Sequence, residues 1–142
     1  MTIGRIIEGK AGGVISCDAQ ATVEEAARLL ADNRIGAMPV YDGGQLAGIF
    51  SERDLLYCIA REGSAVLTRQ VREVMTAPAI SVEPETGVLE ALALMTRRRI
   101  RHLPVARNET VTGFVSIGDL VKHRMDLIEA EAEQMREYIQ TA

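Results

Sequence analysis

The sequence predicts a mixed α/β (α+β) fold made of two pseudo-symmetric β-α-β-β-α units and a long C-terminal helix. Three observations predict it. The chain repeats itself at a constant spacing, each copy combines short apolar runs with an amphipathic helical pattern, and the last segment carries apolar residues every three or four positions. With 142 residues and 47% apolar content, the chain can fill a core.

The internal repeat has an offset of 65 positions, the difference between residue numbers 80 and 15, and it needs no gap. The matching segments are Ile15-Ser16 with Ile80-Ser81, Arg34-Ile35 with Arg99-Ile100, Pro39-Val40 with Pro104-Val105, Gly48 with Gly113, Ser51 with Ser116, and Asp54-Leu55 with Asp119-Leu120. Each copy of about 60 residues buries too little surface to be comfortably stable alone. We therefore expect the copies to pack against each other as one module.

Each copy predicts the same order of elements. Short apolar runs predict strands over 14–17, 37–41 and 46–50, and over 79–82, 102–106 and 111–115 in the second copy. Thr22 and Glu25 have the spacing of a capping box that opens a helix, which ends near Asn33, and its counterpart ends near Arg98. Pro39 and Pro104 belong at strand edges because proline has no N–H to donate. We assign 3–62 to the first unit, 63–70 to a linker, 71–124 to the second unit and 125–142 to the C-terminal helix, with 3–7 and 71–75 as lead-ins to their units.

The C-terminal segment predicts a long helix with one apolar seam between acidic neighbours. The seam consists of Val121, Met125, Ile128, Ala132, Met135 and Ile139. It can pack on its own domain or on a second subunit, and the sequence leaves both interpretations open.

Two motifs of the form Gly-x-x-Ser-x-x-Asp end a strand and open a helix, with Ser51 and Asp54 in one and Ser116 and Asp119 in the other. A helix start offers free N–H groups and a positive dipole end that suit phosphate, and a carboxylate can accept hydrogen bonds from ribose hydroxyls. The glycine that precedes each serine allows a ligand or backbone to approach closely. Simple capping of the helix predicts the same residues, so each motif alone leaves both interpretations open.

The tandem arrangement, the Arg-Ile-x-x-x-Pro-Val segments and the repeated motifs resemble a pair of cystathionine-β-synthase-type (CBS) domains, or Bateman module, of the stand-alone bacterial type. The resemblance covers roughly residues 3–124. It implies a cleft with two sites for AMP, ADP, ATP, NAD(H) or S-adenosyl ligands, and a homodimer. It implies that Asp54 and Asp119 hold ribose, that Ser51 and Ser116 lie near phosphate, and that Ile15, Ser16, Ile80 and Ser81 contact adenine.

The two copies differ in charge at positions that can reach phosphate. Arg101 and His102 follow Ile100, whereas Gly36 and Ala37 follow Ile35. Arg53 lies inside the first motif. We therefore predict two unequal sites, with the Asp119 site the better one for AMP-like ligands. The arginines around Arg101 can instead be solvated charges that complement the end of the preceding helix.

Composition excludes several classes of protein. A net charge of -4 disfavours a general nucleic-acid binder, and two cysteines that lie far apart without CxxC spacing cannot frame a zinc site with only two histidines. We expect Cys17 and Cys58 to be buried small hydrophobes. The sequence contains no membrane-spanning run, signal peptide, P-loop or catalytic Cys-His or Ser-His arrangement. We therefore expect a cytoplasmic, non-catalytic regulatory protein that senses an adenine nucleotide and acts on an unidentified partner, without a catalytic cofactor, metal or membrane contact. The alternative is a dimerisation module whose nucleotide cleft is empty.

Overall fold

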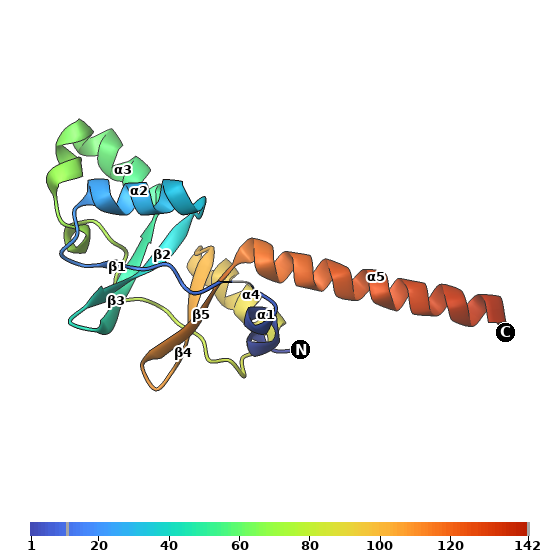
Figure 1. The fold of residues 1–142 in the computed structure, drawn as a ribbon. Coiled ribbons are helices and arrows are strands. Elements are labelled where there is room, and N and C mark those ends of the chain that lie inside the picture. The colour runs from blue at the N-terminus through green and yellow to red at the C-terminus, as the bar shows by residue number, and fades with distance from the viewer. Residues whose placement is uncertain (11, 142) are drawn as a thin grey trace.

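The computed structural model of the protein describes residues 1–10 and 12–141. The elements are α1 (Ile3–Glu8), β1 (Cys17–Asp18), α2 (Val23–Asn33), β2 (Ala37–Asp42), β3 (Gln45–Ser51), α3 (Glu52–Glu62), the 3-10 helices η1 (Gly63–Thr68) and η2 (Val71–Glu73), α4 (Val88–Arg98), β4 (His102–Arg107), β5 (Thr110–Ser116) and α5 (Ile117–Thr141). Figure 1 shows α2 and α3 beside the first sheet and α1 and α4 beside the second. The predicted α/β class and the long C-terminal helix are confirmed.

The first strand of each copy is shorter than predicted. β1 starts at Cys17 and pairs in parallel only with the end of β2, which also pairs with antiparallel β3. In the second copy the first strand is reduced to one bridge between Val82 and Val105, beside the hairpin of β4 and β5. The Val82 N–H donates to the Pro104 carbonyl at 3.0 Å and the Ala106 N–H donates to the Val82 carbonyl at 2.8 Å, but Pro84 has no N–H for the next bond, which Ala19 donates to Tyr41 in the first copy. Proline therefore ends the parallel ladder there.

The two main helices begin and end where the sequence predicts. The Thr22 side chain caps the backbone N–H of Glu25, whose carboxylate accepts from the Thr22 N–H, so the predicted capping box forms. α2 ends at Asn33 and α4 at Arg98. Each is followed by an arginine in the left-handed conformation, Arg34 and Arg99, whose N–H bonds back into the last turn of its helix. The Arg-Ile segments are therefore helix C-caps in both copies.

The two lead-in segments are exchanged between the cores, which corrects the expectation that each packs with the unit that follows it. Ile3 is fully buried in the core of the second copy, and Ile6 and Ile7 pack against that core. Val71 is fully buried in the core of the first copy. The segment 3–7 thus crosses from its own copy to the other and ties the halves together.

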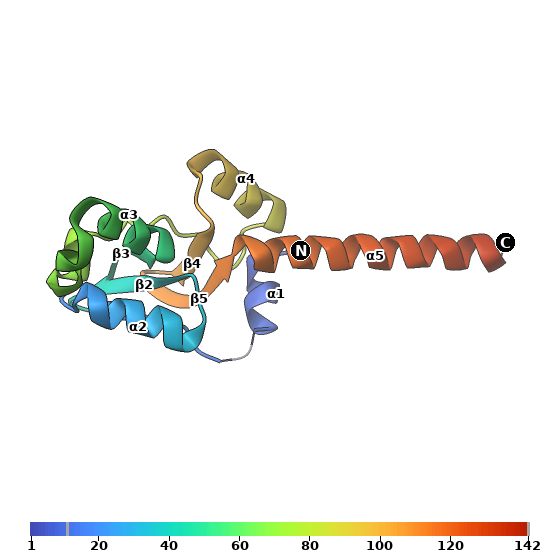
Figure 2. The same cartoon turned by 90° about the horizontal axis from the view of Figure 1, so that it is seen from above.

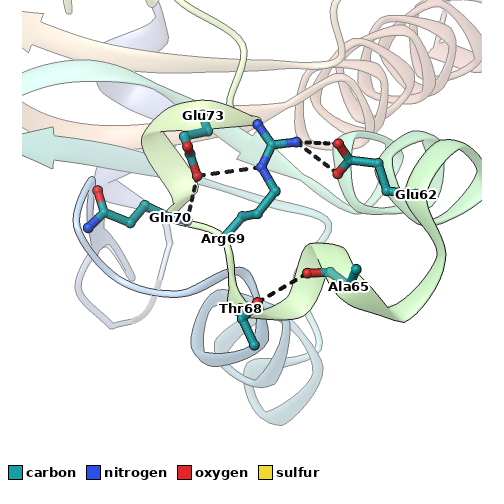
Figure 3. A network of polar contacts seen from close by, with 6 residues as sticks. All are labelled: Glu62, Ala65, Thr68, Arg69, Gln70 and Glu73. Carbon is teal, nitrogen blue, oxygen red and sulfur yellow. Dashed lines mark hydrogen bonds and ion pairs between the residues drawn. The ribbon is translucent and has the colours of Figure 1, made fainter.

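The predicted linker 63–70 is an ordered part of the first half. It forms η1, and Val66 is fully buried in the first core. Arg69 donates to Glu62 at the end of α3 at 2.6 Å and lies 3.5 Å from Glu73 in η2 (Figure 3). One guanidinium therefore joins the end of α3 to the second lead-in.

α5 is continuous, because the second helix of the second copy runs on without a break into the segment 125–142 that we assigned separately. Leu120 near its start is fully buried, whereas most of its length projects away from the body in both views (Figures 1 and 2). The projecting part of the seam therefore does not pack on its own domain.

Among the described residues, no helix is both long and apolar enough to cross a membrane.

Candidate ligand clefts

The first motif forms a capping box at the start of α3. Asp54 Oδ2 accepts from the Ser51 N–H at 2.9 Å and from the Ser51 hydroxyl at 3.0 Å, and the Asp54 N–H donates to Ser51 Oγ at 3.3 Å. The second oxygen of Asp54 accepts from the Thr76 hydroxyl at 3.0 Å. The capping interpretation of this motif therefore describes the structure, and Thr76 is an additional partner that the motif does not reveal.

The second motif has the same geometry and an ion pair. Asp119 Oδ2 accepts from the Ser116 N–H at 2.8 Å, and the Asp119 N–H donates to Ser116 Oγ at 3.1 Å. Lys10 Nζ lies 2.8 Å from the same carboxylate oxygen and also donates to the Phe114 carbonyl at 2.8 Å. Burial raises the pKa of Asp119, but the hydrogen bonds from Lys10 and Ser116 outweigh it, so the net pKa lies below its usual value. Asp119 is therefore partly neutralised by the N-terminal segment.

A cleft of about 650 Å³ lies beside the first motif and joins the two copies. Its walls bring Ser51, Arg53 and Asp54 together with Arg101, His102 and Ser116. Other lining residues are Gly36, Ile49, Glu52, Tyr57, Thr76, Arg98, Arg99, Ile100 and Ile117. This cleft, which we call the Asp54 cleft, contains six of the eleven residues that we predicted for the site.

A second cleft of about 330 Å³ has Lys10 in its wall, and we call it the Asp119 cleft after the carboxylate that Lys10 contacts, although Asp119 itself does not line it. It is lined by Ile7, Lys10, Gly12, Gly13, Val14, Ile15, Asn33, Ile35, Ala37, Thr112, Gly113 and Phe114. With the 65-residue offset, Asn33, Ile35 and Ala37 correspond to Arg98, Ile100 and His102 of the larger cleft. The two clefts are thus pseudo-equivalent, and each combines the motif region of one copy with the helix-to-strand connection of the other.

This crossed arrangement corrects the expected location of the basic side chains. We predicted that Arg101 and His102 would accompany Asp119 because all three belong to the second copy. Both instead line the cleft beside Asp54. The connection that carries them forms a wall of the other copy's cleft, so the basis for a better Asp119 site is wrong.

The predicted adenine-contacting residues are dispersed. Ile15 lines the Asp119 cleft, whereas Ser16 is exposed and lies in neither cleft. Ile80 packs against the second core, and Ser81 lines a separate groove with Gln45 and Asn108. The observed pairing of the first strands begins closer to the C-terminus than our prediction. Of these four residues, only Ile15 lines one of the two clefts.

The motif glycines accommodate the protein's own chain. A Cβ atom at Gly48 would lie 2.7 Å from the Thr76 carbonyl oxygen and 2.8 Å from the Met75 sulfur. At Gly113 it would lie 2.7 Å from the Ile7 side chain. Both neighbours belong to the exchanged lead-ins or directly follow them. The glycines therefore allow those segments to cross the strands closely, rather than making room for a ligand.

Aromatic stacking connects the clefts. The rings of His102 and Phe114 lie 5.7 Å apart with an interplanar angle of 12°, and each residue lines a different cleft. Burial lowers the pKa of His102, and Lys10 and Arg101 add to this, against the opposing effects of Glu52 and Asp119. His102 therefore favours its neutral form more than an exposed histidine does.

The described residues contain no cluster of three or more His, Cys, Asp or Glu side chains that could hold a metal ion. Cys17 is buried as expected, and burial, with the nearby Asp18 charge, raises the pKa of its thiol to about 11. Cys58 is only half-buried, and burial raises its pKa too. Neither thiol is activated as a nucleophile.

Fold and clefts together define a duplicated α/β module with two pseudo-equivalent clefts between its copies. The family description of the CBS domain matches residues 12–61 and 71–126. The chain therefore belongs to the CBS domain family and contains a pair of these domains.

Relatives cover most of the chain. The CBS domain-containing protein CBSX3, mitochondrial, of Arabidopsis thaliana is 36% identical over 148 residues, spanning 98% of this chain and 72% of the relative. A solved structure of a protein with CBS domains from Burkholderia ambifaria has a TM-score of 0.83 and 38% identity, covering 89% of this chain and 95% of that one. The CBS domain pair of protein MJ0100, in complex with 5'-methylthioadenosine and S-adenosyl-L-methionine, has a TM-score of 0.79 and covers 89% of this chain and 97% of its own. At 22% identity, this last protein shares the fold.

Proposed function

We propose that this CBS domain pair is a non-catalytic regulatory module that binds an adenine nucleotide, with the Asp54 cleft as the principal site. The observation that carries the proposal is the gathering of Arg53, Arg98, Arg99, Arg101 and His102 around the cleft that also contains the start of α3. Most residues of this set come from the second copy, and the carboxylate of Asp54 comes from the first.

Phosphate recognition is the role that the arginines fit. A guanidinium donates two parallel hydrogen bonds to a phosphate, and such charge-assisted bonds are about twice as strong as neutral ones. Arg53, Arg98, Arg99 and Arg101 are exposed residues of the cleft wall and take part in no ion pair within the described residues, so their charges are available to a ligand. Several positive charges around one cavity favour a ligand with one or more phosphates, namely AMP, ADP, ATP or NAD(H).

Ribose and base recognition fit the remaining walls. Asp54 Oδ1 accepts a hydrogen bond only from the exchangeable hydroxyl of Thr76 within the described residues, so it can accept one from a ribose hydroxyl instead. Ile49, Ile100 and Tyr57 supply apolar surface for a purine ring. A volume of about 650 Å³ falls within the usual range for small-molecule sites, roughly 300–1,000 Å³.

Regulation requires that the ligand favour one arrangement of the two copies over another. The cleft spans both copies, so a nucleotide that bridges them changes the relative stability of their arrangements. We propose that a partner protein or a second copy responds to this change in the cytoplasm, and that no reaction is catalysed. A dimerisation module with an empty cleft is the competing function.

Calorimetric titration with AMP, ADP, ATP and NADH tests the proposal. Arg101→Ala should weaken binding of the preferred nucleotide about 30-fold, the size expected for a lost charge-assisted contact of about 2 kcal/mol. Asp54→Asn should weaken it about tenfold, because the amide keeps one acceptor for the helix but loses the charge. Asn33→Ala, at the position that corresponds to Arg98, is the matched control in the other cleft and should leave this binding unchanged.

Thermal unfolding of the same variants separates binding from folding. Equal affinity in Arg101→Ala and the unsubstituted protein would refute the assignment of this cleft. Absence of binding and of any thermal shift at millimolar concentrations of all four nucleotides would favour the dimerisation module, since saturation at 100 times the dissociation constant stabilises a protein by about 2.7 kcal/mol.

A further inference from the structure

α5 carries a continuous apolar seam that the rest of the protein leaves uncovered. Met125, Met135 and Ile139 expose 56%, 61% and 69% of their surfaces. Both views show the helix extending away from the body as a single rod (Figures 1 and 2). In proteins most of the stability of a helix comes from the packing of its apolar face rather than from helix propensity. The seam therefore requires a partner.

The spacing of the seam specifies the kind of partner. Val121, Met125, Ile128, Ala132, Met135 and Ile139 follow each other at intervals of four and three, which are the alternating d and a positions of a heptad. A strict seven-residue repeat matches another helix with the same repeat in a left-handed supercoil. A second copy of α5 has that repeat.

Charges beside the seam specify the orientation of the two helices. Arg124 and Glu131 occupy g positions, and Glu129 and Arg136 occupy e positions. In a parallel, in-register pair each g residue faces the e residue five positions later in the other helix. Arg124 then faces Glu129 of the second copy, and Glu131 faces Arg136. Both of these pairs join opposite charges.

These charges are available for pairing between copies. Within residues 1–10 and 12–141, Arg124, Glu129 and Glu131 take part in no ion pair, and Arg136 contacts Glu133 at 3.2 Å with both side chains largely exposed. An exposed intrahelical pair of this kind contributes little and can be exchanged. The parallel arrangement thus gains four opposite-charge contacts by symmetry without breaking a buried one.

Antiparallel arrangements fit less well. The alignment that covers the whole seam sets Ile128 beside Ala132 of the other helix, and it makes Glu129 face Glu129 and Glu131 face Glu131. Sliding the helices by one heptad in one direction restores opposite charges but leaves Met135 and Ile139 without seam partners. Sliding them in the other direction leaves Val121 and Met125 without one.

We propose that α5 of two copies forms a parallel, in-register coiled coil over residues 121–139, held by the apolar seam and by the contacts of Arg124 with Glu129 and of Glu131 with Arg136. This proposal does not depend on the nucleotide function. It holds the two CBS pairs at the same end of the coil, so that they lie next to each other.

Disulfide trapping in the full chain tests the register. In a Cys58→Ser background, Ile128→Cys should form a disulfide between identical positions of two copies when a mild oxidant is added. Ala130→Cys, which lies on the outer f position of the same helix, is the matched control and should cross-link at least about tenfold more slowly. Equal rates for the two variants would overturn the proposal.

A charge exchange tests the orientation with the same measurement. Adding Glu129→Lys to the Ile128→Cys variant should slow cross-linking about tenfold, because the new ammonium group then faces the guanidinium of Arg124. Adding Arg124→Glu as well should restore the rate to within about threefold, since opposite charges face each other again. In either shifted antiparallel alignment the second change gives no rescue. Faster cross-linking in a mixture of Ile128→Cys and Ala132→Cys than in Ile128→Cys alone would overturn the parallel arrangement.

Discussion

The two halves of the molecule share one backbone plan but differ in the charge of the clefts beside them. Both carry the same serine-aspartate capping box, the same left-handed arginine after the first helix, and a glycine that admits a lead-in segment. The Asp54 cleft gathers arginines and a histidine, whereas the Asp119 cleft has Asn33 and Ala37 at the corresponding positions and a lysine already paired with its carboxylate. Residues that build the fold are thus repeated, whereas several charged residues that line the clefts are not.

The comparison also indicates which residues of the clefts have a structural role. In both copies the serine side chain accepts from the backbone N–H of the aspartate, and the aspartate side chain accepts from the backbone N–H of the serine. Each helix needs this cap, so capping by itself explains why both residues are repeated. Side chains that differ between the copies, such as Arg101 against Gly36, are free of that requirement. Ligand specificity is therefore expected to depend mainly on the unrepeated residues.

The largest difference in stability is expected at the motif glycines. Gly48→Ala should destabilise the protein by about 3 kcal/mol, because the new methyl group meets a backbone carbonyl and the Met75 sulfur. Gly113→Ala should cost about 1 kcal/mol, because the Ile7 side chain can shift. Urea unfolding of both variants measures the difference. Equal losses of the free energy of unfolding would mean that the chain beside Gly48 can shift as readily as the Ile7 side chain beside Gly113.

A smaller effect is expected from pH through His102, which lies in the larger cleft. Burial lowers its pKa, so the free protein contains mostly neutral imidazole near neutral pH. A bound phosphate favours the imidazolium and raises that pKa, so binding takes up a proton and strengthens as the pH falls. NADH affinity should increase about threefold between about pH 7.5 and 6.

Titration of His102→Gln at the same pH values is the control, because the amide cannot take up a proton. Its affinity should stay constant over this range. The same pH dependence in the variant and in the unsubstituted protein would remove His102 from contact with the phosphate.

The smallest effect is expected from the ion pair of the Asp119 cleft. The pKa of Asp119 is lower in the folded protein than its usual value of 3.8, so the pair stabilises the fold above that pH, and the contribution is lost as the pH falls through the folded pKa. Lys10→Met should therefore reduce the free energy of unfolding by less than about 1 kcal/mol near pH 7, since both groups are partly exposed. The loss should disappear at about pH 2 in urea unfolding, and a loss that persists there would have another cause.

Most of the fold could be predicted from the sequence because the repeat makes each copy a check on the other. The helix ends at Asn33 and Arg98 and the hairpins follow from local patterns. The exchange of the lead-ins could not be predicted, because Ile3 and Val71 are apolar residues that suit either core equally well. The short first strand of the second copy depends on Pro84, which cannot donate the ladder bond that Ala19 donates in the first copy, and local periodicity does not reveal that pairing.

The candidate site could be predicted in composition but not in assembly. Ser51, Arg53, Asp54, Arg101, His102 and Ser116 do line one cleft. The sequence could not assign Arg101 to Asp54 rather than to Asp119, because each cleft is formed across the copies by pseudo-symmetry. Lys10 and Thr76 were missed because neither belongs to a motif, and each reaches its carboxylate from just after a lead-in segment.

The stacked rings of His102 and Phe114 lie between the two clefts: His102 lines the Asp54 cleft and Phe114 lines the Asp119 cleft. If a ligand in one cleft shifts the first ring, the second ring has to adjust as well, because the two rings are stacked. Thermodynamic linkage makes such coupling reciprocal. The factor by which a ligand in one cleft changes the affinity of the other cleft for its ligand is the same in both directions. With such coupling, the occupancy of each cleft would depend on the concentrations of both ligands.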